Sequence, residues 1–166
     1  AQKDVIPMVY SVVAMTIPHL KKGAMRDFLK ILMRDGRFKK EQWNKSDFIY
    51  TYDSGSIIEF FSADSDKVHG AQRDFLFINE CQFINWETAR QLFVRTAKTV
   101  FLDYNPIKTF WVDEKIMNNP QNKDNFALIH STYKDNYHLT PEQIAEIESN
   151  MYDEVWWGVY GKGITG

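Results

Sequence analysis

The sequence has little of several features that define major protein classes. It has a single cysteine, Cys81, so no disulfide can form within the chain, and this composition fits a reducing compartment. Its formal net charge is −2, so no overall basic balance points to a nucleic-acid partner, although a local basic face stays possible. No apolar run approaches the ~20 residues that a membrane-spanning helix needs. A disulfide scaffold and a membrane span are therefore excluded on composition.

Two kinds of binding motif are also missing. A phosphate-binding loop needs G-x-x-x-x-G-K-[ST], and the one Gly-Lys pair, Gly161-Lys162, is followed by Gly163 and does not complete it. Three of the histidines, His19, His130 and His138, have no cysteine or histidine partner at zinc-ligand spacing, so we expect no zinc site. The 166 residues alone predict no nucleotide-phosphate cradle.

What is present is a globular chain in which buried-type strands alternate with helices. Hydrophobic residues make up 44% of the chain and charged residues 25%, which is typical of a packed domain. The patterns predict strands at 8–15, 75–78, 99–102 and 126–131, a hairpin within 47–63, and helices at 21–36, 84–96, 110–117 and 140–151. Alternation of this kind predicts an α/β fold with a mainly parallel central sheet and helices on both faces.

Polar residues follow three of the predicted strands. They are Asn79-Glu80 after the first, Asp103 to Pro106 after the second, and Thr132 to Asn136 after the third. If these strands are parallel, all three clusters lie along one edge of the sheet, where α/β folds bind ligands. The run "FLFINECQF" (75–83) thus ends with a carboxylate, Glu80, where chemistry is expected.

The strand-end motifs resemble those of a known family. "GSIIEFFSADSDKVHGAQRDFLFINECQFI" (55–84) resembles the region leading into the Walker B strand of the large terminase subunit, the DNA-packaging motor of tailed bacteriophages and prophages. "VFLDYNP" (100–106) and "HSTYKDNYHLTPEQIAEIE" (130–148) look like the coupling segment of that family and the "TYKDN" segment with its helix. The resemblance implies an additional-strand P-loop NTPase fold that lacks its P-loop segment.

The resemblance also assigns roles to four residues. Glu80 matches the catalytic glutamate that activates water. Asn105 matches the coupling segment, where a polar side chain is expected to sense the γ-phosphate or the attacking water; a plain turn before Pro106 is the other interpretation. Asn79 stands where the family usually has an aspartate that holds Mg²⁺ through water. His69-Gly70 replaces an Arg-Gly pair, a candidate arginine finger, and Arg73 is the nearby substitute.

For the whole chain, the resemblance implies a part of a larger protein. Residues 1–166 correspond to a partial ATPase domain, with the P-loop segment expected upstream and a nuclease domain downstream. The complete protein would use ATP and Mg²⁺ and act on double-stranded DNA with a portal protein and a small terminase subunit. A homo-oligomeric ring on the procapsid in the host cytoplasm, with no membrane association, completes this expectation.

Two other classes of function stay open at the level of sequence. The first is a non-catalytic, degenerate NTPase-like module that binds DNA or a packaging partner, which Asn79 favours and Glu80 opposes. The second is a metal-dependent nuclease that uses Asp64, Glu80 and Asp103, which requires these scattered acids to meet at adjacent strand ends.

Overall fold

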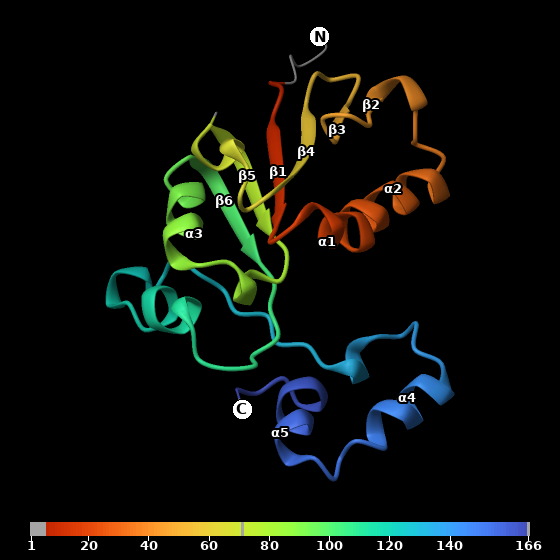
Figure 1. The fold of residues 1–166 in the computed structure, drawn as a ribbon, viewed down its shortest axis with the longest axis vertical. Coiled ribbons are helices and arrows are strands. Elements are labelled where there is room, and N and C mark those ends of the chain that lie inside the picture. Colours follow the sequence, from red (N-terminus) through yellow and green to blue (C-terminus); the bar gives the residue numbers. More distant parts are fainter. Residues whose placement is uncertain (1–5, 71, 166) are drawn as a thin grey trace. The chain divides into compact units, whose positions relative to one another are not determined.

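The computed structural model describes residues 6–70 and 72–165, which fall into two compact units, Ala1–Tyr104 and Asn105–Gly166 (Figure 1). The first unit holds the strands and three helices: β1 (Val9–Ala14), β2 (Trp43–Asn44), β3 (Ile49–Thr51), β4 (Ile57–Ser62), β5 (Arg73–Ile78), β6 (Thr96–Leu102), α1 (Ile17–Lys22), α2 (Ala24–Arg34) and α3 (Trp86–Phe93). The second unit holds α4 (Pro141–Glu148), α5 (Glu154–Trp156) and two π-helical segments, Val112–Met117 and Trp157–Gly161.

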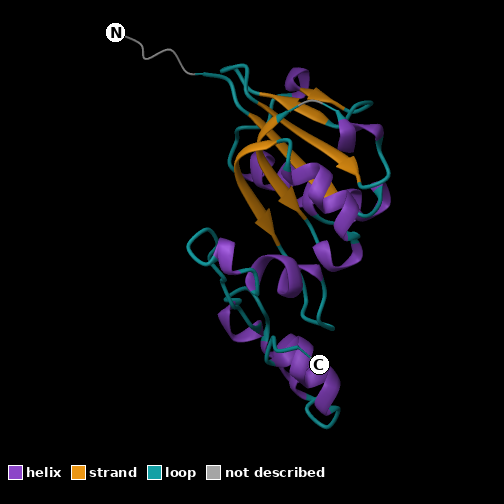
Figure 2. Cartoon of the chain, turned by 90° about the vertical axis from the view of Figure 1, so that its left-hand side faces the viewer, coloured by secondary structure: helices purple, strands orange, loops and turns teal. Residues whose placement is uncertain are grey.

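All six strands belong to one sheet, drawn in orange in Figure 2, and their order is β2-β3-β4-β1-β5-β6 (Figure 1). Strand β1 runs parallel to β4 and β5, and β5 runs parallel to β6, whereas β3 pairs antiparallel with β2 and β4. The predicted mainly parallel sheet and its hairpin are therefore confirmed. Val13 is in register with Ile78, and Ile78 with Leu102, so β1, β5 and β6 end at the same edge.

Helices cover both faces of the sheet because successive side chains of a strand point to opposite sides. On one face Ala14 and Phe60 form a buried cluster with Leu20 and Met25 of the α1–α2 pair. On the other face the side chain of Arg73 reaches the backbone of α3 by donating from Nη1 to the Leu92 carbonyl at 3.0 Å. The strand ends thus belong to a sheet that is packed against helices on both faces.

The helices differ in detail from the expectation. The predicted helix at 21–36 is two helices, because Gly23 (φ −115°, ψ −116°) interrupts the chain between α1 and α2. Helix α1 begins earlier than predicted: Thr16 caps it, and proline is well tolerated in its first turn. Helices α3 and α4 lie within their predicted ranges, and no helix in the described part of the chain is long and apolar enough to cross a bilayer.

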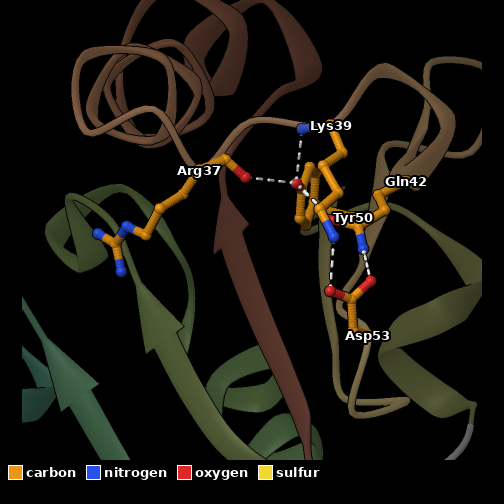
Figure 3. Close-up of polar contacts among 5 residues, drawn as sticks. All are labelled: Arg37, Lys39, Gln42, Tyr50 and Asp53. Atoms are coloured by element: carbon orange, nitrogen blue, oxygen red, sulfur yellow. Dashed lines mark hydrogen bonds and ion pairs between the residues drawn. The ribbon is translucent and has the colours of Figure 1, made fainter.

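Tyr50 of β3 secures the connection between α2 and the hairpin (Figure 3). Its side chain is fully buried, and its hydroxyl accepts a hydrogen bond from the Lys39 amide at 3.0 Å. The same hydroxyl lies 2.7 Å from Gln42 Oε1 and 3.2 Å from the Arg37 carbonyl, either of which can accept its proton. Lys39 and Gln42 also both bind the Asp53 carboxylate, each at 2.6 Å.

The predicted strand at 126–131 is wrong. Within the described residues this segment pairs with no strand, and Leu128 and Ile129 are 58% and 89% exposed. An apolar segment becomes a strand only when a neighbouring strand takes its backbone hydrogen bonds. The cluster at 132–136 is consequently no strand end, and Thr132 and Asp135 instead form a capping box around a short 3₁₀ turn.

Candidate functional site

The ends of β5 and β6 bring three polar side chains together. Asn79 and Glu80 directly follow β5, and Asp103 directly follows β6. The Asn79 amide nitrogen donates to both oxygens of the Asp103 carboxylate, at 3.0 and 3.2 Å. The backbone N–H of Glu80 donates to the same carboxylate at 2.5 Å. Two of the three predicted strand-end clusters therefore meet at one edge, as parallel strands require.

Glu80 adopts a left-handed backbone conformation, with φ 53° and ψ 55°. A residue with a side chain rarely adopts this conformation, and it persists where the surroundings enforce it. Here the bond from the Glu80 amide to Asp103 and the following 3₁₀ turn, Cys81–Phe83, hold the backbone. The turn directs the carboxylate toward α1, where Oε2 contacts His19 Nε2.

Glu80 and His19 line a cavity of about 530 Å³ between the α1–α2 pair and the sheet. Apolar side chains of the sheet supply much of its lining. Asn79, Glu80 and Asp103 at the strand ends are polar, as are His19 of α1 and Asp27 of α2. The side chains of His19 and Glu80 are 34% and 33% exposed, so water reaches both. The strand ends therefore contribute two carboxylates and an amide to a hollow that is otherwise lined largely by apolar side chains.

The residues present fit a Mg²⁺ ion held through water. Because the side-chain nitrogen of Asn79 is turned toward Asp103, the side-chain oxygen of Asn79 is left to accept other hydrogen bonds. That oxygen lies beside Gly23, where an added Cβ would come within 3.4 Å of it, so the glycine keeps this approach open. Asn79 Oδ1 and the Asp103 carboxylate are hard oxygen donors, which suit a hydrated magnesium ion.

Arg73 lies at the other end of β5 from Glu80 and is 3% exposed. Its Nε donates to Ser11 Oγ at 3.0 Å, and the Ser11 hydroxyl donates to Glu59 at 2.6 Å. Burial lowers the pKa of the Arg73 guanidinium below its ordinary value, and the Glu59 carboxylate opposes this shift. The structure thus places Arg73 in the packed layer between sheet and α3 and does not bring it to the strand-end site.

The other candidate residues make contacts of their own. Asn105 begins the second unit and accepts a hydrogen bond from the Ile107 amide at 2.8 Å through its carbonyl, a turn that accompanies Pro106. His69 is exposed at the end of the 3₁₀ turn Asp66–His69. Asp64 accepts from Ser62 Oγ at 2.5 Å. Among residues 6–70 and 72–165 no three His, Cys, Asp or Glu side chains cluster to hold a metal, so the nuclease arrangement has no support.

Cys81, which follows Glu80, is fully buried. Burial raises the pKa of its thiol to about 12, and the nearby Asp103 carboxylate adds to the shift. The thiol is therefore neutral at physiological pH and packs as a small apolar side chain.

The fold is an α/β domain in which a mainly parallel sheet carries polar side chains at the ends of two neighbouring strands. Comparison with protein-family models gave no match, and neither did comparison with curated proteins. Solved structures of the large terminase from a thermophilic bacteriophage share the fold. One crystal form superposes with a TM-score of 0.80 at 19% identity and covers 96% of this chain and 41% of that chain. The complexes of that protein with ADP and with ATP-γ-S give 0.76 and 0.77, at 20% and 21% identity.

These matches confirm, at the level of the fold, the resemblance inferred from the strand-end motifs. The chain spans about two fifths of the length of the phage terminase chains that it matches. The nucleotides in two of those structures are bound to the phage protein.

Sequence reasoning found Asn79, Glu80 and the Asp103 cluster, but it did not assign His19 a role at this site. Strand-to-loop transitions are recognisable from a hydrophobic run and the polar residues that end it. His19 has no such signal, because its proximity to Glu80 arises only when α1 folds back over the end of the sheet.

Proposed function

We propose that this chain is part of the ATPase motor of a phage large terminase, which couples ATP hydrolysis to the packaging of double-stranded DNA into procapsids. The observation that carries the proposal is the placement of Glu80 at the carboxyl end of β5. It is held there in a left-handed turn by Asp103 from the neighbouring parallel strand. The shared fold with a phage large terminase supports the same conclusion.

Glu80 has the chemistry of a general base in phosphoryl transfer to water. Its carboxylate orients a water molecule and accepts a proton from it as the water oxygen bonds to the γ-phosphorus. The bond between that phosphorus and the bridging oxygen breaks, and ADP leaves with the bonding electrons. Mg²⁺, when bound, supplies charge neutralisation on the phosphate oxygens. Asn79 and Asp103 would hold its water shell at the strand ends.

The remaining parts of such a motor belong to this proposal as well. We assign residues 1–166 to a partial ATPase domain whose P-loop and nuclease domain come from other parts of a longer protein. A portal protein, a small terminase subunit and further copies in a ring on the procapsid are the proposed partners. In this scheme Asn105 acts in the coupling segment, and the charge-stabilising arginine comes from elsewhere, since the contacts of Arg73 suit a structural role.

A non-catalytic module that binds DNA or a packaging partner is the second candidate, and one observation favours it. Asn79 brings no charge to the cation site, and its amide nitrogen is committed to Asp103. In that case Glu80 would be a strand-end acid with no effect on turnover.

The test of the proposed function is a packaging reaction with the complete protein, procapsids and linear DNA, scored by ATP-dependent protection of the DNA from nuclease. Glu80→Gln keeps the shape of the side chain and removes the base, so it should abolish protection. Glu87→Gln is the matched control, since Glu87 is an exposed glutamate of α3 that pairs with Arg90 at 2.7 Å. Full protection with Glu80→Gln would favour the non-catalytic module.

A further inference from the structure

His19 is the side chain that meets the carboxylate of Glu80. It lies in α1, whose first turn is fixed by Thr16: the Thr16 hydroxyl accepts the backbone N–H of His19 at 3.3 Å. The imidazole Nε2 contacts Glu80 Oε2, and the ring also packs against Phe83 with their centroids 6.4 Å apart. The ring is thus held from its own helix and from the turn that follows Glu80.

The backbone and the side chain of Glu80 are restrained by different elements. Asp103 of the β6 end holds its backbone N–H. Its carboxylate sits at the end of a flexible side chain, and among the described residues His19 is the one polar side chain that contacts it. Without that contact the carboxylate is free to rotate among its rotamers, since only the backbone would remain fixed.

The contact also leaves the carboxylate able to work as a base. His19 Nε2 engages Oε2, and Oε1 stays available to receive a proton from water. Both side chains line the same cavity and are about one third exposed, so a water molecule can reach the free oxygen. A histidine that buried the carboxylate would block this access.

We propose that His19 is a positioning residue that aims the Glu80 carboxylate at the attacking water and so links helix α1 to the hydrolytic site. This inference rests on the proposed function, because it acts through Glu80. His19 touches neither the nucleotide nor the water in this scheme. It fixes the rotamer of the base, and fixed placement of a catalytic group is a recognised source of rate acceleration.

The test is a double-mutant cycle on steady-state ATP hydrolysis by the complete protein. His19→Ala should lower kcat about tenfold and leave KM for ATP within about twofold, because ground-state binding does not use Glu80. His19→Gln places an amide N–H near the position of Nε2 and should recover most of the loss. Lys22→Ala, an exposed basic residue of the same helix, is the control and should match the parent.

The decisive comparison is made in the Glu80→Gln background. If His19 acts through Glu80, His19→Ala lowers kcat no further in this background. If His19→Ala instead damages the fold, its loss of kcat multiplies with the loss caused by Glu80→Gln. An unchanged or raised kcat for His19→Ala, or fully multiplicative losses, would overturn the inference. If Glu80→Gln itself leaves turnover unchanged, the proposed function fails. If Glu80→Gln is slow and His19→Ala is not, only the role of His19 fails.

Discussion

The Asn79 amide donates to the Asp103 carboxylate, so an aspartate at position 79 would face a second carboxylate. Asn79→Asp removes the two N–H donations to Asp103 and sets a second negative charge about 3 Å from the first. We expect the free energy of unfolding of the chain to fall by about 1 kcal/mol at pH 7, because two hydrogen bonds are lost and two like charges are brought together. Urea denaturation at pH 7 measures this.

The matched control for that substitution is the charge exchange Asn79→Asp with Asp103→Asn, which restores one carboxylate and one amide. It should recover most of the lost stability. A single Asn79→Asp variant as stable as the parent at pH 7 would mean that the two side chains do not interact in solution.

The raised pKa of Cys81 predicts that the free energy of unfolding depends on pH, and it fixes the sign of that dependence. The folded state keeps the thiol neutral up to about pH 12, whereas the unfolded chain ionises near the ordinary thiol value. The contribution of the buried thiol to the free energy of unfolding is therefore fully present below about pH 8.5 and is lost as the pH rises toward 12. Between pH 8 and 10.5 the parent should lose about 2 kcal/mol more unfolding free energy than Cys81→Ala. Equal losses in the two proteins would show that the thiol titrates normally in the folded state.

At the scale of elements, Tyr50 ties the segment after α2 to the hairpin. Its buried hydroxyl accepts from the Lys39 amide and donates to one of two acceptors, so Tyr50→Phe removes these part-buried hydrogen bonds and leaves the Lys39 N–H without its partner (Figure 3). We expect a loss of about 1–2 kcal/mol in unfolding free energy by urea titration. Tyr52→Phe is the control, because the Tyr52 hydroxyl has no hydrogen-bond partner among the described residues, and its effect should be near zero. Similar effects for both variants would contradict the role given to Tyr50.

The elements also show what the sequence reveals by itself. Strands β1, β5 and β6 were predictable because a short apolar run ended by polar residues is a local signal, and the Asp53–Ser56 turn marked the hairpin. The segment at 126–131 has the same local signal and forms no strand, since pairing depends on a neighbour that its own residues do not specify. Gly23 divides the predicted helix because the chain turns there, which helical periodicity does not register.

The same limit applies to the candidate site. Asn79 and Glu80 are adjacent in sequence and were recognisable from the end of β5, whereas the pairing of Asn79 with Asp103 depends on the register of β5 with β6. Arg73 was considered as a charge-stabilising residue because the family resemblance implies an arginine near this position, where the chain has His69-Gly70. Its burial and its bonds to Ser11 and Leu92 were visible only in the folded chain.

At the scale of the whole molecule, the chain has the site that we propose activates water but no phosphate-binding loop motif among its 166 residues. We therefore expect the isolated 166-residue chain to show negligible ATP hydrolysis and at best weak nucleotide binding, because backbone amides and a lysine must cradle the phosphates. Isothermal titration calorimetry with Mg-ATP measures this. A micromolar dissociation constant would show that the phosphate site lies within these residues.

The central claim, that Glu80 is the base that activates water, is tested most directly by single-turnover hydrolysis of γ-labelled ATP in the complete protein. Glu80→Gln should bind ATP with nearly the affinity of the parent and cleave it ~10²-fold more slowly or worse, since the amide holds the shape of the site but accepts no proton. Cleavage by Glu80→Gln at the rate of the parent, with ATP bound to the same extent, would contradict the account.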